Sequence, residues 1–235
     1  MSRQKFGANY WKLWTASVVS NFGDGVSTIA YPWLASLITR DGFKLGLVVL
    51  AGRLPWLLFS LPAGVITDRV DRKRLVVGMD AFRAVLTAGV VAIVAANVGV
   101  LDDPATPVPN ETFLLMVVIA TAFLFGVAEV LRDNTAQTLM PALVEKEQLE
   151  SANGRLWAAE VVMNQSVGPP LGGVLIGLAL VLPFVVHSAT FAISAVILAT
   201  LAGSFRTPAK EGVKRPTFKA DLAEGFKFLW SHSVL

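Results

Sequence analysis

The 235-residue sequence contains no cysteine and only two histidines. Without cysteine, neither a disulfide framework nor a thiolate metal site can form. His187 and His232 are too far apart in the sequence to suggest a catalytic or metal site. There is also no His-Glu-x-x-His pattern and no phosphate-binding glycine loop followed by Lys-Ser or Lys-Thr. These absences argue against an enzyme, and we expect no metal site and no cofactor.

Charged residues are scarce as well, at 16% of the chain, whereas 54% of the residues are hydrophobic. The apolar residues form long blocks and not a 3.6-residue stripe, a pattern typical of helices that face lipid. The strict alternation over about ten residues that a transmembrane β-barrel requires does not occur. The basic residues cluster at the ends of the blocks, which indicates an anionic membrane surface and not nucleic acid as the partner. The sequence therefore predicts an all-α integral membrane protein in contact with the lipid bilayer.

The apolar blocks predict a six-transmembrane-helix bundle over residues 13–203, with spans at about 13–38, 45–66, 75–100, 113–131, 156–182 and 183–202. Residues 1–12 form an N-terminal segment with aromatic residues at the membrane boundary. Residues 204–235 are expected to form a linker and an amphipathic helix that leads toward a missing seventh span.

The distribution of cations predicts the orientation. Lysines and arginines collect in the N-terminal segment, in the connections after the second and fourth spans, and after the sixth span. The opposite loops hold only Arg40 and Lys44. Because short loops rich in Lys and Arg stay in the cytoplasm, we expect both ends of the chain inside and the loop 102–110 outside.

Several polar residues lie within the apolar blocks. Ser20–Gly25 is expected to interrupt the first span and to face protein or a water-filled cavity. Asp24 could cap a broken helix, but a carboxylate near the membrane midplane costs about 3 kcal/mol, which favours a cavity-lining role. We expect Arg53 to pair with an acid across the bundle, Asp24 being the nearest candidate in depth. For Glu129, a proton carrier and a structural partner are equally supported, because intramembrane acids serve both uses.

Other ionisable residues in the spans carry weaker expectations. Asp80 and Arg83 are three residues apart on one helical face and should pair. Glu160 gives little signal, and His187 more often corresponds to a hydrogen-bonded packing residue than to a proton relay.

A short charged hinge separates the second and third spans. Its residues resemble the signature loop of the major facilitator superfamily, Gly-x-x-x-Asp-Arg-x-x-Arg-Lys, at Gly64, Asp68, Arg69, Arg72 and Lys73. The family's usual second glycine is Asp71 here, a departure shared with exporters of drugs and siderophores. We expect this gating loop to act as a latch, with Asp68 pairing to Arg72 and with Arg132 and Asp133 as gating partners. Arg72 can also reach the acids Glu129 and Asp133.

Two further stretches extend the resemblance. In the fifth span, Gly168, Pro169, Gly172 and Gly173 resemble the later half of the superfamily's antiporter motif, and such residues favour a flexible seam of close helix packing. The connection Pro141–Asn153 resembles the macrolide-efflux and enterobactin-exporter branch. The resemblance implies the N-terminal half of a twelve-helix exporter of amphiphilic small molecules, such as a macrolide or a siderophore, coupled to protons in a bacterial inner or plasma membrane.

Half of such a fold requires a second six-helix half. It could be a missing C-terminal half, a separate chain or a second copy of this chain. The alternative function is a six-span membrane module that binds or scaffolds without transporting. Costly charges within the spans favour the transporter, because a scaffold has no need of them.

Overall fold

The computed structural model describes residues 6–102 and 107–206 together with Phe218, Leu222 and Lys227. The predicted amphipathic helix between Phe218 and Trp230 lies mostly outside the described residues. The predicted six-span bundle falls within the described residues, apart from residues 103–106 in the loop after the third predicted span.

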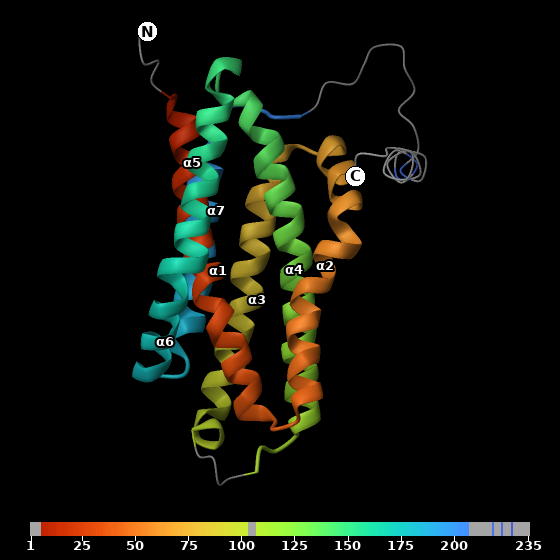
Figure 1. Ribbon diagram of the computed structural model, residues 1–235, viewed down its shortest axis with the longest axis vertical. Helices are drawn as coiled ribbons and strands as arrows, with labels where there is room; N and C mark the ends of the chain where they lie inside the picture. Colours follow the sequence, from red (N-terminus) through yellow and green to blue (C-terminus); the bar gives the residue numbers. More distant parts are fainter. Residues whose placement is uncertain (1–5, 103–106, 207–217, 219–221, 223–226, 228–235) are drawn as a thin grey trace.

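The described part of the chain is built from helices, which confirms the all-α prediction. They are α1 (Ala8–Ile38), α2 (Gly42–Arg69), α3 (Arg72–Leu101), α4 (Glu111–Leu139), α5 (Leu149–Val161), α6 (Gly168–Leu178) and α7 (Leu182–Ala199). Two 3-10 turns, η1 (Met140–Ala142) and η2 (Lys146–Gln148), connect α4 to α5, and a π-helical segment, η3 (Val162–Val167), joins α5 to α6. α5, η3 and α6 together therefore form one long, irregular helical segment (Figure 1).

By length and composition, five helical segments of the described residues could cross a membrane. They are Gly42–Arg69, Arg72–Leu101, Glu111–Ala142, Lys146–Leu178 and Leu182–Ala199. α1 is long enough, at 31 residues, but its Ser20–Gly25 stretch makes it less apolar than the others. The five segments establish a multi-pass membrane protein.

The predicted interruption of the first span is wrong, because α1 continues through Ser20–Gly25 as one helix. Ser20 and Asp24 are instead contacted by Arg83 of α3, and Ser20, Asn21 and Asp24 are all buried. α2 likewise continues through Pro55 and Pro62 and passes Gly64, the residue predicted to end it. It bends along its length (Figure 1) but does not stop, because a proline removes one backbone donor without removing the rest of the ladder.

The fourth and fifth helical segments also differ from the predicted spans. α4 extends about two turns beyond residue 131, so Arg132 and Asp133 lie inside the helix and not in a connection. The predicted fifth span, 156–182, is divided by η3 and ends at Leu178. Hydropathy alone placed these boundaries at the first charges and missed the change in helix type.

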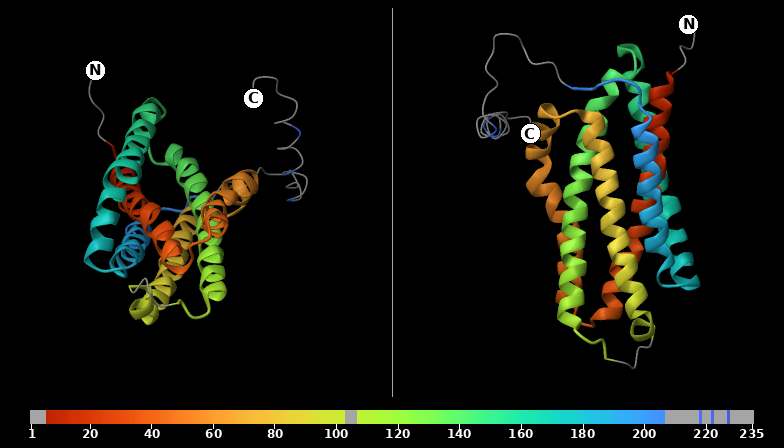
Figure 2. Two further views of the ribbon diagram at one scale, coloured as in Figure 1. Left: turned by 60° about the horizontal axis from the view of Figure 1, so that its bottom comes forward. Right: turned by 180° about the vertical axis from the view of Figure 1, so that it is seen from behind.

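The helices run up and down in one bundle (Figure 2). α2 packs on α4, α3 packs between α4 and α7, and α1 packs against α6 and α7. The N-terminus, the α2–α3 turn, the α4–α5 connection and the segment after α7 lie at one end of the bundle, which we call the α2–α3 end (Figure 1). The α1–α2, α3–α4 and α6–α7 connections lie at the opposite end.

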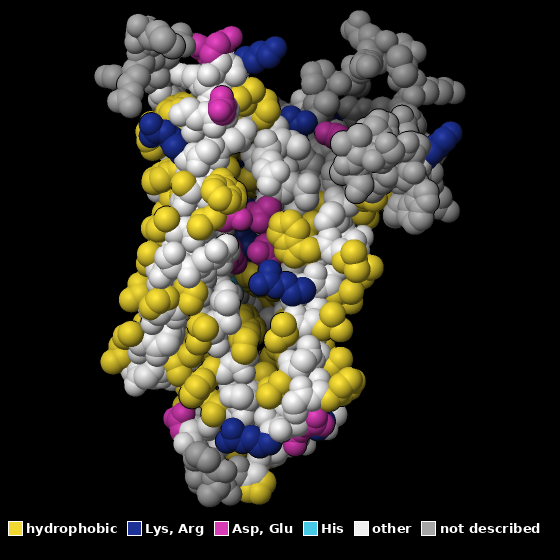
Figure 3. Space-filling view, viewed as in Figure 1, with side chains coloured by type: hydrophobic (Ala, Val, Ile, Leu, Met, Phe, Trp, Pro, Cys, Tyr) yellow, Lys and Arg dark blue, Asp and Glu magenta, His cyan; other side chains and the backbone are white. Residues whose placement is uncertain are grey.

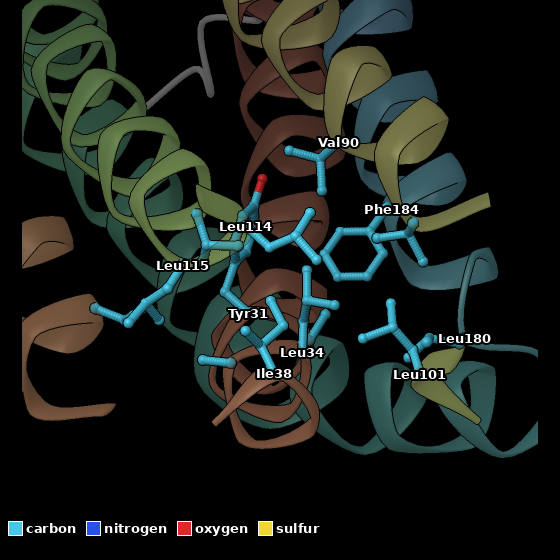
Figure 4. Packing of buried hydrophobic residues seen from close by; sticks show 14 residues of the cluster. Tyr31, Leu34, Ile38, Val90, Leu101, Leu114, Leu115, Leu180 and Phe184 are labelled. Atoms are coloured by element: carbon cyan, nitrogen blue, oxygen red, sulfur yellow. The ribbon is translucent and has the colours of Figure 1, made fainter. Parts of the chain in front are cut away.

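Two clusters of buried apolar side chains hold the two ends of the bundle together. The cluster far from the α2–α3 end joins residues of α1, α3, α4 and α7, including Tyr31, Leu34, Leu114 and Phe184 (Figure 4). The other cluster includes Leu13, Val76, Leu139 and Leu198. The polar residues described below lie between these two clusters along the helices.

Glycines bring α1 and α6 into backbone contact. A Cβ atom placed on Gly168 would lie 2.5 Å from the Cα of Gly25, and one on Gly172 would lie 2.8 Å from the carbonyl oxygen of Val26. Gly173 has no neighbour within 4 Å of such an atom. The predicted packing seam in the antiporter-like motif is therefore formed by Gly168 and Gly172, whereas Gly173 faces away from it.

Candidate functional site

A cavity of about 640 Å³ opens between the α2–α4 side and the α1–α5 side of the bundle. The acidic side chains of Asp24, Glu129, Asp133 and Glu160 line it together with Arg53. The remaining lining residues are mostly aromatic, small or amide-bearing: Tyr31, Trp56, Phe125, Asn164, Gln165 and Pro169 among them. Figure 3 shows acidic groups gathered in this hollow with a basic group beside them.

Asp24 lies on the inner wall of the cavity and pairs with a cation from α3. The Nη1 atom of Arg83 is 3.4 Å from the Oδ1 atom of Asp24. The Nη2 atom of Arg83 donates to Ser20 at 2.8 Å and contacts Asp80 at 2.7 Å, which confirms the expected pair of Asp80 and Arg83. Asp80 and Arg83 are completely buried.

Aromatic rings and a hydroxyl complete the surroundings of these charges. The Arg83 guanidinium lies 4.1 Å from the centre of the Phe191 ring and 5.3 Å from that of Phe125. On its other oxygen, Asp80 accepts a hydrogen bond of 2.5 Å from Ser194 of α7. A buried arginine so placed stabilises two carboxylates and is itself stabilised by ring faces.

Arg132 extends the charged network to α4. Its Nη1 atom contacts Asp133 at 3.0 Å, its Nε atom lies 3.7 Å from Asp80, and its Nη2 atom donates to Ser17 at 2.9 Å. Asp24, Asp80, Arg83, Arg132 and Asp133 thus form one connected group, which we call the buried charge network. It links α1, α3 and α4 in the middle of the bundle.

His187 packs against this network. It is completely buried, with the centres of the Phe191 and Phe125 rings 4.6 Å and 5.0 Å from its own. Its Nε2 atom is 4.0 Å from the Oδ1 atom of Asp24, and neither ring nitrogen has a hydrogen-bond partner among the described residues. The expectation of a hydrogen-bonded packing residue is therefore correct for the packing and wrong for the hydrogen bond.

The predicted pair of Arg53 and Asp24 is wrong. Both residues line the cavity, but Asp24 is held by Arg83 from behind, and Arg53 makes no ion pair within 4.0 Å among the described residues. The depth of a residue in the membrane can be read from the sequence. Its partner is decided by the direction in which its side chain points from the helix axis.

Glu129 and Glu160 differ from the other cavity acids. Neither makes an ion pair within 4.0 Å in the part of the chain that the structure describes. Glu129 is partly buried on α4, one turn before Asp133, and Glu160 lies on α5 across the cavity. Together with Arg53, these are the charges that face the cavity without a fixed partner. No group of three His, Asp or Glu side chains among the described residues could hold a metal ion.

The gating loop forms the turn between α2 and α3 at Val70 and Asp71. Arg72 contacts Asp68 at 3.4 Å, in an exposed pair at i, i+4 spacing. Below the turn, the hydroxyl groups of Thr67 on α2 and Thr135 on α4 are 3.1 Å apart. Gly64 has open space beside it, where no heavy atom would meet a Cβ.

The expected contacts from Arg72 to Glu129 and Asp133 are not formed within the described residues. Arg72 pairs with Asp68, and Asp133 pairs with Arg132 of its own helix. Because α4 continues past Asp133 for more than a turn, both acids lie deeper in the bundle than the predicted span boundary placed them.

Asp71 and Lys73 of the same turn both contact the segment that follows α7. The Oδ1 atom of Asp71 accepts from the backbone N–H of Arg74 at 3.0 Å, which caps α3. Its Oδ2 atom accepts from the hydroxyl of Ser204 at 3.0 Å and from the N–H of Phe205 at 3.3 Å. Partial burial acts to raise the pKa of Asp71, but the three hydrogen bonds and the charge of Arg74 outweigh it, so that the pKa lies below its usual value.

Several functional residues were missed in the sequence. Tyr31, Trp56 and Phe125 line the cavity, but aromatic residues in an apolar span give no signal of which side they face. The pair of Asp80 and Arg83 was expected, yet nothing in its spacing indicates that it is the counter-charge of Asp24.

The described helices thus form a multi-pass bundle with an acidic, aromatic cavity in its middle and a charged turn at one end. A profile of the family described as transmembrane secretion effector, MFS_3, matches residues 6–235. The chain therefore belongs to this family of the major facilitator superfamily.

Curated relatives agree with this assignment. The chain is 28% identical over 227 residues to the multidrug efflux pump Tap of Mycobacterium tuberculosis H37Rv, covering 94% of this chain and 50% of the pump. It is 25% identical over 223 residues to Tap of Mycolicibacterium fortuitum, covering 94% of the chain and 52% of that protein.

The similarity to macrolide efflux protein A of Streptococcus pyogenes is 26% over 151 residues, or 62% of the chain and 34% of that protein. The chain thus spans about half the length of the Tap pumps it matches. No solved structure matches it significantly.

Proposed function

We propose that this chain is the six-span N-terminal half of a proton-coupled secondary exporter of amphiphilic small molecules. The carrying observation is the cavity of about 640 Å³, in which acids without fixed partners face aromatic side chains. Ionisable groups inside a membrane are costly, and such groups mark substrate or ion pathways. α1 would be the first of the six spans, made compatible with the membrane by burial of its polar face against α3, α6 and α7.

Protons would be carried by Glu129 in the first place. Asp24 is held by Arg83, so protonation of Asp24 would break an existing ion pair. Glu129 has no cation within 4.0 Å among the described residues and can take up or release a proton without such a loss. Asp24 is then the second candidate, acting through a change of its contact with Arg83.

The substrate would be an amphiphile that fits between aromatic rings and acids. The names of the relatives, a multidrug efflux pump and a macrolide efflux protein, support a drug-like molecule. Trp56 and Phe125 offer ring faces, and Arg53 offers a cation on the opposite wall from Glu160. Export of a siderophore is the other substrate class that the family resemblance implies.

A second six-helix half would cover the open side of the cavity. Polar groups turned toward lipid are expensive, and alternating access requires two bundles that rock around a central site. The half could be a continuation of the chain, a separate chain or a second copy. The relatives, about twice as long as the matched region, support the first of these.

The orientation follows from the cations. The N-terminus, the α2–α3 turn, the α4–α5 connection and the segment after α7 lie at one end of the bundle (Figure 1). This is the end at which Lys and Arg are concentrated, and by the positive-inside tendency it would lie in the cytoplasm. The protein would then be a multi-pass cell-membrane protein with its N-terminus and its post-α7 segment inside.

The test is drug-dependent proton flux in proteoliposomes, for the chain alone and for the assembly that includes a second half. We expect coupling only in the assembly. There, Glu129→Gln should reduce the flux about a hundredfold, the lower end of the range for loss of a proton-transfer group. Glu147→Gln, at an exposed position in η2, is the matched control and should leave the flux unchanged.

Three outcomes would contradict the proposal. Undiminished coupling in both Glu129→Gln and Asp24→Asn would give the two acids a structural role. Flux driven by a monodisperse monomer would remove the need for a second half. An assembly that binds drug but carries no protons or drug across the membrane would favour the alternative, a binding or scaffold module.

A further inference from the structure

The segment that leaves α7, Thr200–Arg206, does not leave the bundle directly. It runs across the α2–α3 end and contacts the gating loop between α2 and α3 (Figure 2). Ser204 and Phe205 donate to the Oδ2 atom of Asp71, and the backbone N–H of Arg72 donates to the carbonyl of Phe205 at 3.4 Å. Asp71 and Arg206 also form an antiparallel bridge.

Three more side chains hold the beginning of the same segment. The Nζ atom of Lys73 donates to the carbonyl oxygen of Leu201 at 2.6 Å. From the start of α1, the side chain of Asn9 donates to the carbonyl of Ala202 at 2.9 Å and accepts from its N–H at 3.2 Å. Lys12 donates to the carbonyl of Thr200 at 2.7 Å. Both α1 and α3 therefore bind the backbone of this segment.

We propose that the α2–α3 turn is a docking site for the connector Leu201–Arg206, with Asp71 as the residue that recognises it. The turn and the connector then move as one body. The gating loop would have a second role besides its Asp68–Arg72 pair, because it would fix the point at which the chain leaves the six-helix bundle. This proposal does not depend on transport.

The two side-chain oxygens of Asp71 bind different partners. Oδ1 caps the first turn of α3 and would be needed by any helix that begins here. Among the residues that the structure describes, Oδ2 accepts from Ser204 and Phe205 of the connector and not from α3. A carboxylate is suited to this double use, since it has two oxygens and accepts several hydrogen bonds at once.

The connector is shaped to present its donors to this oxygen. Gly203 has a φ of +112°, in the region that side chains disfavour, and the turn it makes brings the hydroxyl of Ser204 and the N–H of Phe205 to the same atom. Farther along the chain, the guanidinium of Arg69 lies 5.7 Å from the ring centre of Phe218. The turn is thus contacted twice by the chain that follows α7.

Mechanically, the docking site couples two parts of the chain. Asp68, Arg72 and Asp71 lie within five consecutive residues, so a change in the Asp68–Arg72 contact displaces the residue that holds the connector. Movement of the turn would therefore be transmitted to whatever follows Arg206 without passing through the cavity.

The test is amide hydrogen exchange of the full 235-residue chain in nanodiscs, followed on peptides that cover residues 200–206. Asp71→Asn keeps an oxygen for the cap of α3 but places an amide where the N–H of Phe205 needs an acceptor. Exchange in the connector should become about tenfold faster, the factor expected for losing a hydrogen bond to a charged group. Ser204→Ala removes one connector bond without touching the cap and should act in the same direction.

Asp41→Asn is the matched control. Asp41 caps α2 by accepting a 2.9 Å hydrogen bond from the N–H of Phe43. It lies at the opposite end of the bundle from the connector Leu201–Arg206. It should leave exchange at residues 200–206 unchanged. Exchange in α3 and α7 shows whether each variant is folded. A connector as protected in folded Asp71→Asn and Ser204→Ala as in the unaltered chain would overturn the proposal.

Discussion

Replacing Gly168 by alanine tests the backbone contact between α1 and α6. The new Cβ atom would lie 2.5 Å from the Cα and 2.6 Å from the carbonyl carbon of Gly25, and 2.7 Å from the carbonyl oxygen of Met163. Carbon atoms pack best at about 3.5–4.0 Å, so the two helices must separate by about 1 Å. The atoms in the way belong to the backbone and cannot rotate aside, unlike the end of a flexible side chain.

The magnitude follows from this geometry. Overpacking of this kind costs up to about 3 kcal/mol, and alanine regains about 1 kcal/mol over glycine in a helix. Gly173→Ala in the same helix is the matched control, because it gains the same helix propensity and meets no atom within 4 Å. The difference between the variants is then about 3 kcal/mol, or about 6–12 °C in melting temperature for a domain of this size.

The assay is thermal unfolding in detergent or nanodiscs, followed by the fluorescence of the six tryptophans. Gly168→Ala should melt below the unaltered chain, and Gly173→Ala at or above it. Gly25→Ala should resemble Gly168→Ala, and the double variant should lose less than the sum of the two, because helices already separated accept the second methyl group. Equal melting temperatures for Gly168→Ala and Gly173→Ala would refute the seam.

Two other predictions concern charge and topology. Arg83→Met should destabilise the chain by about 3–5 kcal/mol, because it leaves buried carboxylates unpaired. Arg53→Met, at an exposed cavity position without an ion pair among the described residues, should have little effect on the melting temperature. Similar losses of stability for both variants would contradict the network. In this cysteine-free chain, Asp102→Cys should react with an impermeant thiol reagent in intact cells and Glu147→Cys only after permeabilisation. The reverse labelling would place the α2–α3 end outside.

The helices could be predicted because backbone groups in a membrane must be satisfied within each segment, and the long apolar blocks leave no other structure. Their ends could not. The predicted fourth span stops at residue 131 because hydropathy falls at Arg132 and Asp133, yet α4 continues to Leu139. It can do so because Arg132 pairs with Asp133 and also contacts Asp80 and Ser17 of neighbouring helices. A hydropathy count treats every charge as exposed to lipid.

The cavity residues Asp24, Glu129 and Arg53 could be predicted because charges inside a membrane rarely face lipid. Their pairing could not, because it depends on how each helix is rotated. α3 presents Arg83 to Asp24, whereas α2 presents Arg53 to the open cavity. The π-helical segment Val162–Val167 was missed for a similar reason, since nothing in its composition distinguishes it from an α-helix.

The buried charge network also bears on how this sequence can change during evolution. Its five members come from three helices, and each arginine contacts two carboxylates. Losing Arg83 leaves Asp24 without its arginine, and losing Arg132 does the same to Asp133, so a single substitution of either arginine is penalised even where the new residue fits the space. Viable sequences should therefore exchange these positions together, as sets that keep the charges balanced. Glu160 and Arg53, which have no such partners among the described residues, carry no such penalty and can vary one at a time. Changes in what the cavity accepts can then accumulate at its surface while the charges behind it stay fixed.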